Sequence, residues 1–166
     1  MSVLDDRGSR LLLRAEIEEL VVEHSYLLDR GRFAELVELY TDDCEVTRPL
    51  PPFTSSVNET IRGRAALREW YANPAAWPPT PRTMRHVMSN LRLAAAAEDR
   101  ASGLSTWTGY RYEGEGISTA LPMAVGDYED EYRRAADGRW QIRRRKIVIA
   151  FLNQQLLEAA MNAAKS

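Results

Sequence analysis

The chain has 166 residues, of which 45% are hydrophobic and 28% are charged, and its formal net charge is −2. This length and balance predict one domain, residues 1–166 with a core over roughly 9–150, that buries a sizeable interior. The slightly negative charge argues against a dedicated nucleic-acid-binding protein, which would carry a basic excess, so we expect no nucleic-acid partner.

The N-terminus and the single cysteine bear on the compartment. Residues 1–10 contain no apolar run, and Leu11-Leu12-Leu13 is followed at once by Arg14, so no signal peptide is predicted. The longest apolar run, Ile147 to Leu152, is too short to span a bilayer, so no membrane partner is expected. Cys44 alone cannot form an internal disulfide or a thiolate zinc cluster, and we predict no metal. The expected location is cytoplasmic.

The first half of the chain predicts helices. Apolar residues recur at helical spacing over roughly 9–29, behind a charged face, and Arg30-Gly31 ends this helix because glycine readily takes the left-handed C′ conformation. The elements that follow are a short helix from Phe33, a strand at Cys44–Arg48, a loop at 50–60, a third helix at Gly63–Tyr71 and a second loop at Asn73–Pro81.

The second half changes from helical to strand periodicity. The predicted strands are 83–96, 101–112, 121–135 and 139–150, with hairpin turns at Glu98–Arg100 and Ala136–Arg139. Helices followed by an antiparallel meander are typical of an α+β fold, with the helices packed on one face of the sheet. Phe151–Ala164 predicts a C-terminal helix, whose apolar side needs the pocket mouth or another subunit to cover it.

Histidine can take and return a proton near neutral pH, and the chain has only His24 and His86. Strand alternation puts Met88 on the same face as His86. A neighbouring carboxylate would fix the histidine tautomer and stabilise the imidazolium, and we expect Asp29 to supply it inside a pocket. On an ideal helix Asp29 lies about 140° from His24, so the two share a pocket only if the helix loosens at its end. His24 fits a buried structural histidine as well as a substrate contact.

Six segments, in this order and spacing, resemble the SnoaL-like branch of the nuclear-transport-factor-2-like superfamily. They are Leu28–Phe33, Leu39–Asp43, Ile61–Ala66, Arg85–Asn90, Gly126–Tyr132 and Asp137–Ile142. The resemblance implies a strongly curved antiparallel sheet, wrapped with helices into a cone whose open end holds a hydrophobic ligand. Relatives with this layout include scytalone dehydratase, bile-acid 7α-dehydratases, lindane dehydrochlorinase, limonene epoxide hydrolase and polyketide cyclases. The small β subunits of ring-hydroxylating dioxygenases share the fold.

The resemblance also implies residue roles. In the dehydratases and the dehydrochlorinase, an aspartate at the end of the first helix pairs with a histidine on a central strand, at positions that match Asp29 and His86. The family's reactions need no cofactor, and we expect none here. Two positions depart from the dehydratase pattern: His24 stands where some dehydratases have a tyrosine, and Arg48 stands at the position matched to a second tyrosine.

The last predicted strand changes phase. Trp140 and Ile142 share one face, whereas Ile147 and Ile149 have the opposite parity. A β-bulge within Arg143–Lys146 would bring the two sets into phase and turn Arg145 inward. That orientation would match a pocket arginine of the dehydrochlorinase, although a solvated cationic edge is equally compatible with the sequence.

Two more residues on predicted strands are candidate substrate contacts. Asp127 follows Gly126 and is in phase with Met123 and Val125, so it is either a second pocket carboxylate or an exposed residue. Tyr110 is compatible with the core, the rim of the pocket or a ligand contact.

The expected function is cofactor-independent acid/base chemistry on a small hydrophobic, cyclic molecule. His86 would abstract a proton, Asp29 would support it, and Arg145 or Arg48 would stabilise the charge that develops. Dehydration, dehydrohalogenation, isomerisation and cyclisation share that step, and the sequence does not choose among them.

Two alternatives belong to other functional classes. A non-catalytic ligand-binding module would leave Asp29 and His86 too far apart to hydrogen-bond. A dioxygenase β subunit would co-purify with a larger iron–sulfur partner. In each case the apolar outer surface predicts a homodimer or homotrimer.

Overall fold

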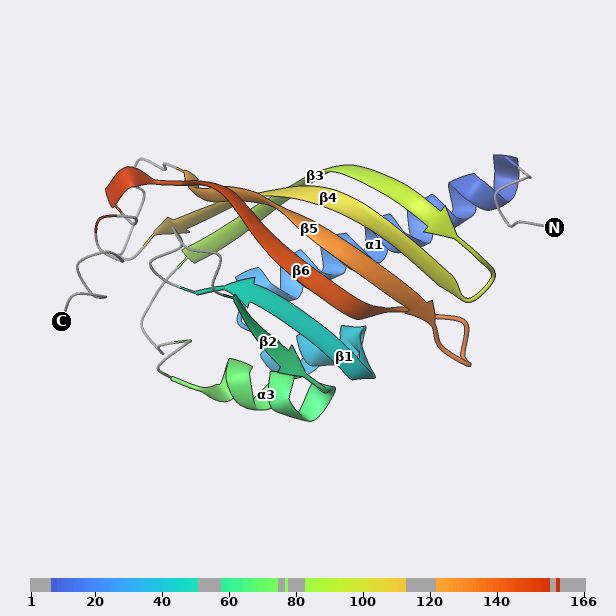
Figure 1. The fold of residues 1–166 in the computed structure, drawn as a ribbon, viewed down its shortest axis with the longest axis horizontal. Helices are drawn as coiled ribbons and strands as arrows, with labels where there is room; N and C mark the ends of the chain where they lie inside the picture. Colours follow the sequence, from blue (N-terminus) through green and yellow to red (C-terminus); the bar gives the residue numbers. More distant parts are fainter. Residues whose placement is uncertain are drawn as a thin grey trace.

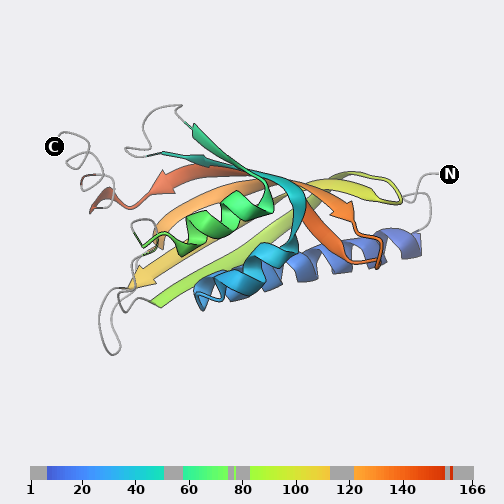
Figure 2. The same ribbon diagram turned by 90° about the horizontal axis from the view of Figure 1, so that it is seen from below.

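A curved six-stranded sheet forms the body of the protein, and the helices lie on one face of it (Figures 1 and 2). The computed structural model describes residues 7–50, 58–74, 77, 83–112, 122–155 and 158. The elements in chain order are α1 (Arg7–Asp29), α2 (Phe33–Leu36), the 3₁₀ turn η1 (Val37–Leu39), β1 (Tyr40–Pro49), β2 (Asn58–Arg62), α3 (Arg64–Ala72), β3 (Thr83–Ala96), β4 (Arg100–Tyr112), β5 (Pro122–Arg134) and β6 (Trp140–Leu152). The predicted cone-shaped α+β class is confirmed.

The strand order is β2-β1-β6-β5-β4-β3, and the predicted meander accounts for the run from β3 to β6. The expectation of a wholly antiparallel sheet is wrong at one pairing, because β1 runs parallel to β6, with Val46 beside Arg145. A parallel pair needs a long crossover, and here the chain from β2 through α3 to β5 provides it. The sheet is therefore mixed, with its two halves joined along β1 and β6.

The helix α1 lies along the inner face of the sheet and ends where the sequence predicts. Gly31 has a φ of 66°, and its N–H donates to the carbonyl oxygen of Leu28 at 3.1 Å. The N–H of Arg32 reaches back to the carbonyl oxygen of Leu27 at 3.0 Å, which completes a Schellman cap. Asp29 is thus the last residue of α1, fixed at the point where the chain leaves the helix.

The predicted β-bulge in β6 is confirmed. The register of β6 against β5 shifts between Ile142 and Arg144, so both Ile142 and Arg145 face the helices. Arg145 is only 1% exposed and pairs in register with Asp130 of β5. The alternative of a solvated cationic edge is therefore wrong for Arg145, although Arg144 beside it is exposed.

Two segment predictions need correction. The predicted loop at 50–60 contains the start of β2, which pairs with β1 so that Ile61 lies opposite Val46; residues 51–57 lie outside the described residues. The predicted C-terminal helix begins too early, because Phe151 continues β6 and pairs with Val125. Of the remainder of that predicted helix, only residues 153–155 and 158 are described.

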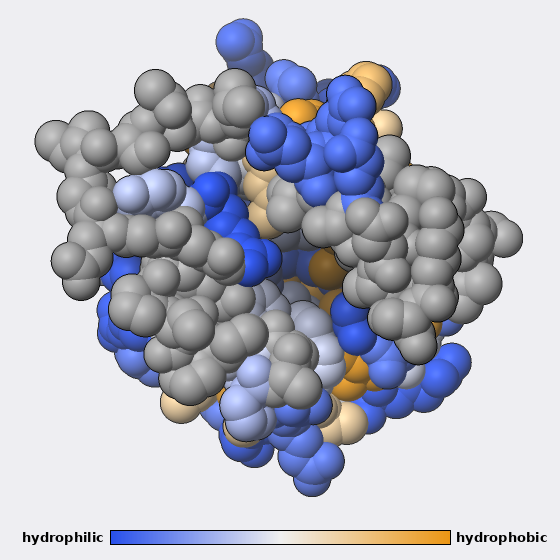
Figure 3. Space-filling model, turned by 90° about the vertical axis from the view of Figure 1, so that its left-hand side faces the viewer, coloured by the Kyte–Doolittle hydropathy of each residue, from blue (hydrophilic) through white to orange (hydrophobic). Residues whose placement is uncertain are grey.

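The buried side chains form two clusters between the sheet and the helices. The larger one joins α1, α2 and α3 to the inner face of the sheet, with Ile17, Leu36, Leu67 and Ile142 inaccessible to solvent. The smaller one contains Trp107, Ala124 and Tyr128 from β4 and β5. The end of the molecule where β3 begins and β6 ends shows a central hollow, in which hydrophilic and hydrophobic residues both reach the surface (Figures 1 and 3).

Within the described ranges, no helix combines the length and the apolar character needed to cross a bilayer.

Candidate active site

Asp29 and His86 are joined by two hydrogen bonds. The imidazole Nδ1 of His86 lies 2.6 Å from Oδ1 of Asp29, and the backbone N–H of His86 donates to Oδ2 at 2.8 Å. Both side chains are 6% exposed. The C-terminal end of a helix is the negative pole of its dipole, so the dipole of α1 does not stabilise the negative charge of a carboxylate at Asp29. The backbone N–H and the ring Nδ1–H of His86 stabilise that negative charge instead, by donating hydrogen bonds to it.

This geometry fixes the tautomer of His86. A carboxylate only accepts hydrogen bonds, so Nδ1 carries a proton, and in the neutral imidazole the free lone pair is on Nε2. Nε2 points toward Gly109 of β4, where a methyl group in place of the glycine hydrogen would lie 3.7 Å away. His86 is in register with Gly109, and a methyl group there would also lie 3.3 Å from Cε of Met123 and 3.3 Å from Cζ3 of Trp107, so the imidazole lies against a closely packed part of β4 and β5. The arrangement presents a base on the inner face of the sheet.

His24 is buried between α1 and the sheet, and its Nε2 lies 2.9 Å from the hydroxyl of Tyr40. Burial lowers the pKa of His24 well below its usual value, and the charges of Arg145 and His86 lower it further. His24 is therefore neutral at neutral pH. Its Nδ1 is buried and has no partner among the described residues.

Arg145 is held in a buried ion pair. Its Nε and Nη2 donate to the two carboxylate oxygens of Asp130 at 2.8 and 2.7 Å, and the Tyr132 hydroxyl donates to the same carboxylate at 3.0 Å. Burial opposes the charge of Arg145, but Asp130 together with Tyr40 and Tyr128 outweighs it, so the pKa of Arg145 is raised. The guanidinium lies 4.0 Å above the ring of Tyr128, a cation–π contact.

Tyr128 connects this ion pair to the dyad. Its ring stacks against Trp107 at 5.8 Å and meets His24 edge-on at 6.2 Å. Burial raises the pKa of Tyr128 to about 12, opposed by Arg145 and reinforced by Asp130 and Asp29. The hydroxyl is therefore neutral at neutral pH and lies within electrostatic reach of the Asp29 carboxylate.

Three other predicted contacts lie elsewhere. Tyr110 pairs with Arg85 and occupies the face of β4 opposite Gly109. Asp127 occupies the face of β5 opposite Tyr128 and accepts a hydrogen bond from Thr106 at 2.9 Å. Strand alternation thus turns both away from the dyad, and their prediction as pocket residues is corrected. Arg48 lies on the inner face of β1 but is held by Glu59 at 2.6 Å and lies 5.0 Å from the ring of Trp70.

A family model of the SnoaL-like domain matches residues 9–146. The chain belongs to the SnoaL-like domain family. No protein with a curated functional description matches it in sequence.

Solved structures share the fold of this SnoaL-like chain at low sequence identity. A candidate scytalone dehydratase from Novosphingobium aromaticivorans is 23% identical, with a TM-score of 0.68 over 87% of this chain and 88% of that one. ActVI-ORFA from Streptomyces coelicolor is 19% identical, with a TM-score of 0.70 over 83% and 97%. The β subunit of a candidate aromatic-ring-hydroxylating dioxygenase from Novosphingobium aromaticivorans is 14% identical, with a TM-score of 0.70 over 87% and 93%. At these identities the likenesses show the fold.

The sequence reasoning missed two residues of the SnoaL-like site, Tyr128 and Asp130. Both alternate along β5 with the exposed Glu129 and Glu131. This alternation was the sequence feature that could have placed them on the inner face of the sheet. The sequence pattern favours Asp127 instead, because it follows Gly126 and is in phase with Met123. Asp130 could have been identified only together with the bulge in β6, which brings Arg145 into register with it.

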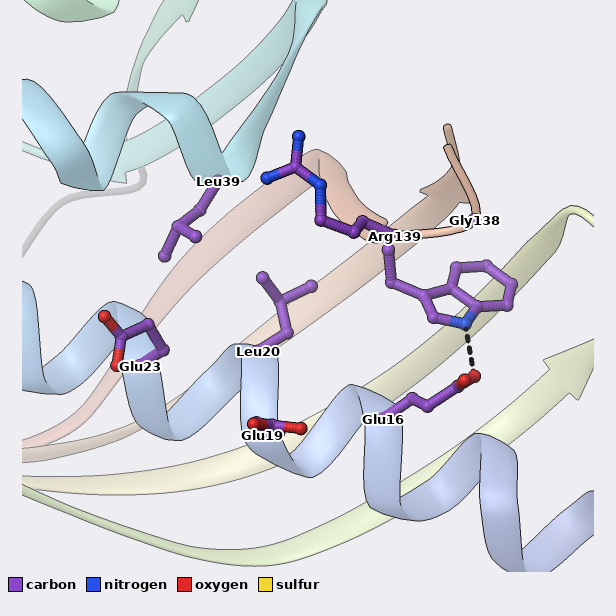
Figure 4. Close-up of a pocket in the computed structure, with 8 residues that line it drawn as sticks. Glu16, Glu19, Leu20, Glu23, Leu39, Gly138 and Arg139 are labelled. Atoms are coloured by element: carbon purple, nitrogen blue, oxygen red, sulfur yellow. Dashed lines mark hydrogen bonds between the residues drawn. The ribbon is translucent and has the colours of Figure 1, made fainter. Parts of the chain in front are cut away.

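A separate cleft of about 420 Å³ lies along the other half of α1 (Figure 4). Its lining includes three glutamates of α1 together with Leu20, Arg139 and Trp140; the glutamates are Glu16, Glu19 and Glu23. The indole N–H of Trp140 donates to Glu16 at 2.9 Å, the hydrogen bond that a dashed line marks in Figure 4. These glutamates lie about 9 to 20 Å from Asp29 along the helix, at 1.5 Å per residue, and neither Asp29 nor His86 lines the cleft, so it is separate from the dyad site.

Proposed function

We propose that the protein is a cofactor-independent acid/base enzyme of the lyase or isomerase/cyclase type, acting on a small hydrophobic, cyclic molecule. His86 is the general base, and Asp29 holds its tautomer and stabilises the imidazolium that forms. The observation that carries this proposal is the pair of hydrogen bonds from His86 to Asp29, which makes Nε2 the basic nitrogen of the neutral imidazole, on the side of Gly109.

The proposed reaction begins when Nε2 of His86 takes a proton from a carbon of the substrate. The positive charge gained by the imidazole is balanced by Asp29, 2.6 Å away. Expulsion of a leaving group would complete an elimination, whereas return of the proton to another carbon would complete an isomerisation. Both outcomes use the same base, so the dyad supports either.

Three other residues are proposed to contact the substrate. Met88 lies two residues after His86 on the same face of β3 and packs against the Trp107 cluster. Nδ1 of His24 has no partner in the part of the chain that the structure describes, and Arg145 contributes a buried positive charge. Arg48 remains a proposed contact from the α3 side of the inner face.

Turnover of cyclic hydroxy-ketones and halogenated rings by purified protein tests the proposal. His86→Ala should lower the turnover on the order of 10²–10⁴-fold in folded protein, because general-base catalysis typically contributes that much. Asp29→Asn should also lower it, since an amide cannot accept both N–H groups of His86 with full charge. The exposed Asp137→Asn serves as a control and should leave turnover unchanged. Unchanged turnover in His86→Ala would refute His86 as the base.

The two alternatives make different predictions. The non-catalytic alternative expected Asp29 and His86 to be too far apart to hydrogen-bond, and the 2.6 Å contact counts against it. An assembly role like that of the dioxygenase β subunit is supported only by the shared fold. Obligate co-purification with a larger iron–sulfur protein, without turnover of any cyclic substrate by the isolated chain, would favour that role.

A further inference from the structure

A groove runs along α1, between the helix and the turns that join β3 to β4 and β5 to β6. Its larger part is the cleft of about 420 Å³ described above, and a second hollow of about 140 Å³ adjoins it. The two share Glu16 and Trp140 as lining residues, so they are parts of one groove. The second hollow is also lined by Ser9, Leu12, Leu13, Ala97, Glu98 and Arg134. From Leu12 to Glu23 the groove is about 17 Å long, at 1.5 Å per residue of helix.

Apolar side chains line both parts of the groove. Leu20 and Leu39 point into the larger part, from α1 and from η1 (Figure 4). In the smaller part Leu13 is buried, whereas Leu12 is 62% exposed. Removing apolar surface from water is favourable, so a partner that covers Leu12 gains free energy by doing so.

Three carboxylates of the groove lack a partner. Glu19, Glu23 and Glu98 are exposed and make no hydrogen bond or ion pair within the part of the chain that the structure describes. Glu18, by contrast, pairs with Arg14 at 3.8 Å. Glu19 and Glu23 are also one turn apart on the same face of α1, where like charges repel each other. A positive charge placed in the groove would therefore be stabilised.

The arginines that line the groove do not balance these carboxylates. Arg134 lies 3.4 Å from one oxygen of Glu16, whose other oxygen accepts the indole N–H of Trp140. Arg139 lies 2.7 Å from Asp137, which does not line the groove. Both positive charges of the lining are thus already paired, and the groove keeps an excess of negative charge.

We propose that this groove is a docking site for an extended segment of a partner protein that carries lysine or arginine beside apolar residues. About five extended residues, at about 3.3 Å each, match the length of the groove. Apolar side chains of the segment cover Leu12 and Leu20, and its basic side chains pair with the free carboxylates. Neither Asp29 nor His86 lines the groove, so docking there is a second property of the chain and does not depend on the proposed function.

The probe is the peptide acetyl-Leu-Lys-Lys-Leu-Lys-amide, added to ¹⁵N-labelled full-length protein. Side chains of an extended peptide alternate between its two sides, and this sequence puts leucine and lysine on both sides. The indole N–H signal of Trp140, which lines both parts of the groove, should shift on binding. The signal of Trp107, in the smaller buried cluster, should stay in place. An analogue with glutamine in place of each lysine should bind about 10- to 100-fold more weakly, because it loses three ion pairs.

Glu19→Gln and Glu23→Gln each remove one free carboxylate and keep the size of the side chain. Each should weaken the binding of the lysine peptide about 2- to 5-fold, the loss expected for one exposed ion pair. Glu69→Gln is the matched control, because Glu69 is also an exposed glutamate without a partner in the described ranges but belongs to α3. It should bind the peptide as the wild type does. All three positions are exposed, so the variants should fold as the wild type does.

Four outcomes would overturn the inference. If the Trp140 signal does not respond to the lysine peptide at millimolar concentration, the groove is not a docking site. If the glutamine analogue binds equally well, the charge of the groove plays no part. If Glu69→Gln weakens binding as much as Glu19→Gln does, the attraction comes from the net charge of −2 rather than from the groove. If spermidine shifts the Trp140 signal and binds as tightly as the peptide, the groove takes a small cation and not a segment of a partner.

Discussion

The two histidines of this chain have different partners. Nδ1 of His86 lies 2.6 Å from the carboxylate of Asp29, an anion. His24 bonds to the neutral hydroxyl of Tyr40, and burial together with the charges of Arg145 and His86 lowers its pKa. His24 is thus held in surroundings that resist its protonation.

His24 should make the fold less stable in mild acid. Its pKa is about 6.5 in the unfolded chain and well below that in the folded one, so between these values only the unfolded state binds the proton. The free energy of unfolding should therefore fall by about 1.4 kcal/mol per pH unit as the pH drops below about 6. Above pH 7 the histidine is neutral in both the folded and the unfolded state, so it does not make the free energy of unfolding depend on pH.

Urea unfolding of wild type and His24→Gln between pH 7.5 and 5 measures this contribution. Glutamine does not titrate, so the difference in unfolding free energy between the two proteins should change with pH by that slope. Two curves that stay parallel down to pH 5 would show that His24 takes up its proton equally in both states.

At the scale of the strands, β5 and β6 carry two neighbouring ion pairs in opposite environments. Arg145 and Asp130 are buried on the inner face, with side chains 1% and 0% exposed. Lys146 and Glu129, one residue along each strand, are about half exposed and lie 2.9 Å apart. The two ion pairs join the same two strands at neighbouring register positions. They differ mainly in how deeply they are buried, so comparing them shows the effect of burial on an ion pair.

Asp130→Ala should lower the free energy of unfolding by about 3–5 kcal/mol, because it leaves Arg145 as an uncompensated buried charge. Glu129→Ala should change it by less than about 1 kcal/mol, because an exposed pair is screened by water. Chemical denaturation of both variants at neutral pH checks the contrast. Equal losses in the two variants would mean that water reaches Arg145.

The elements differ in how far the sequence determines them. Helical spacing with Gly31 as a cap defined the end of α1, and strand parity predicted the bulge that turns Arg145 inward. The short strand β2 was missed because its five residues gain their pairing from β1 rather than from their own pattern. The expectation that Asp29 and His86 pair gained most of its support from the family resemblance, since 57 residues separate them and no local pattern connects a helix end to a strand.

At the scale of the whole molecule, the sheet has an apolar row on the face away from the helices. Val87, Thr108, Val125 and Phe151 are in register across β3, β4, β5 and β6. The two ends of the row are the most exposed, at 55% for Val87 and 71% for Phe151. Thr108 and Val125 between them are half-buried, so the row carries two exposed apolar side chains and one half-buried one, which is typical of an association site.

We expect a homodimer or homotrimer that uses this row, because the outer face of the sheet can pack against a second copy of itself. Light scattering at micromolar concentration should give two or three times the 18.9 kDa mass of one chain. Phe151→Glu places a charge in the row and should shift the mass toward that of a single chain, since an unpaired charge is costly to bury. Leu12→Glu alters an exposed leucine of α1, 62% accessible and outside the row, and should leave the mass unchanged. A wild-type mass of 18.9 kDa would exclude the assembly, and equal effects of the two variants would place the contact elsewhere.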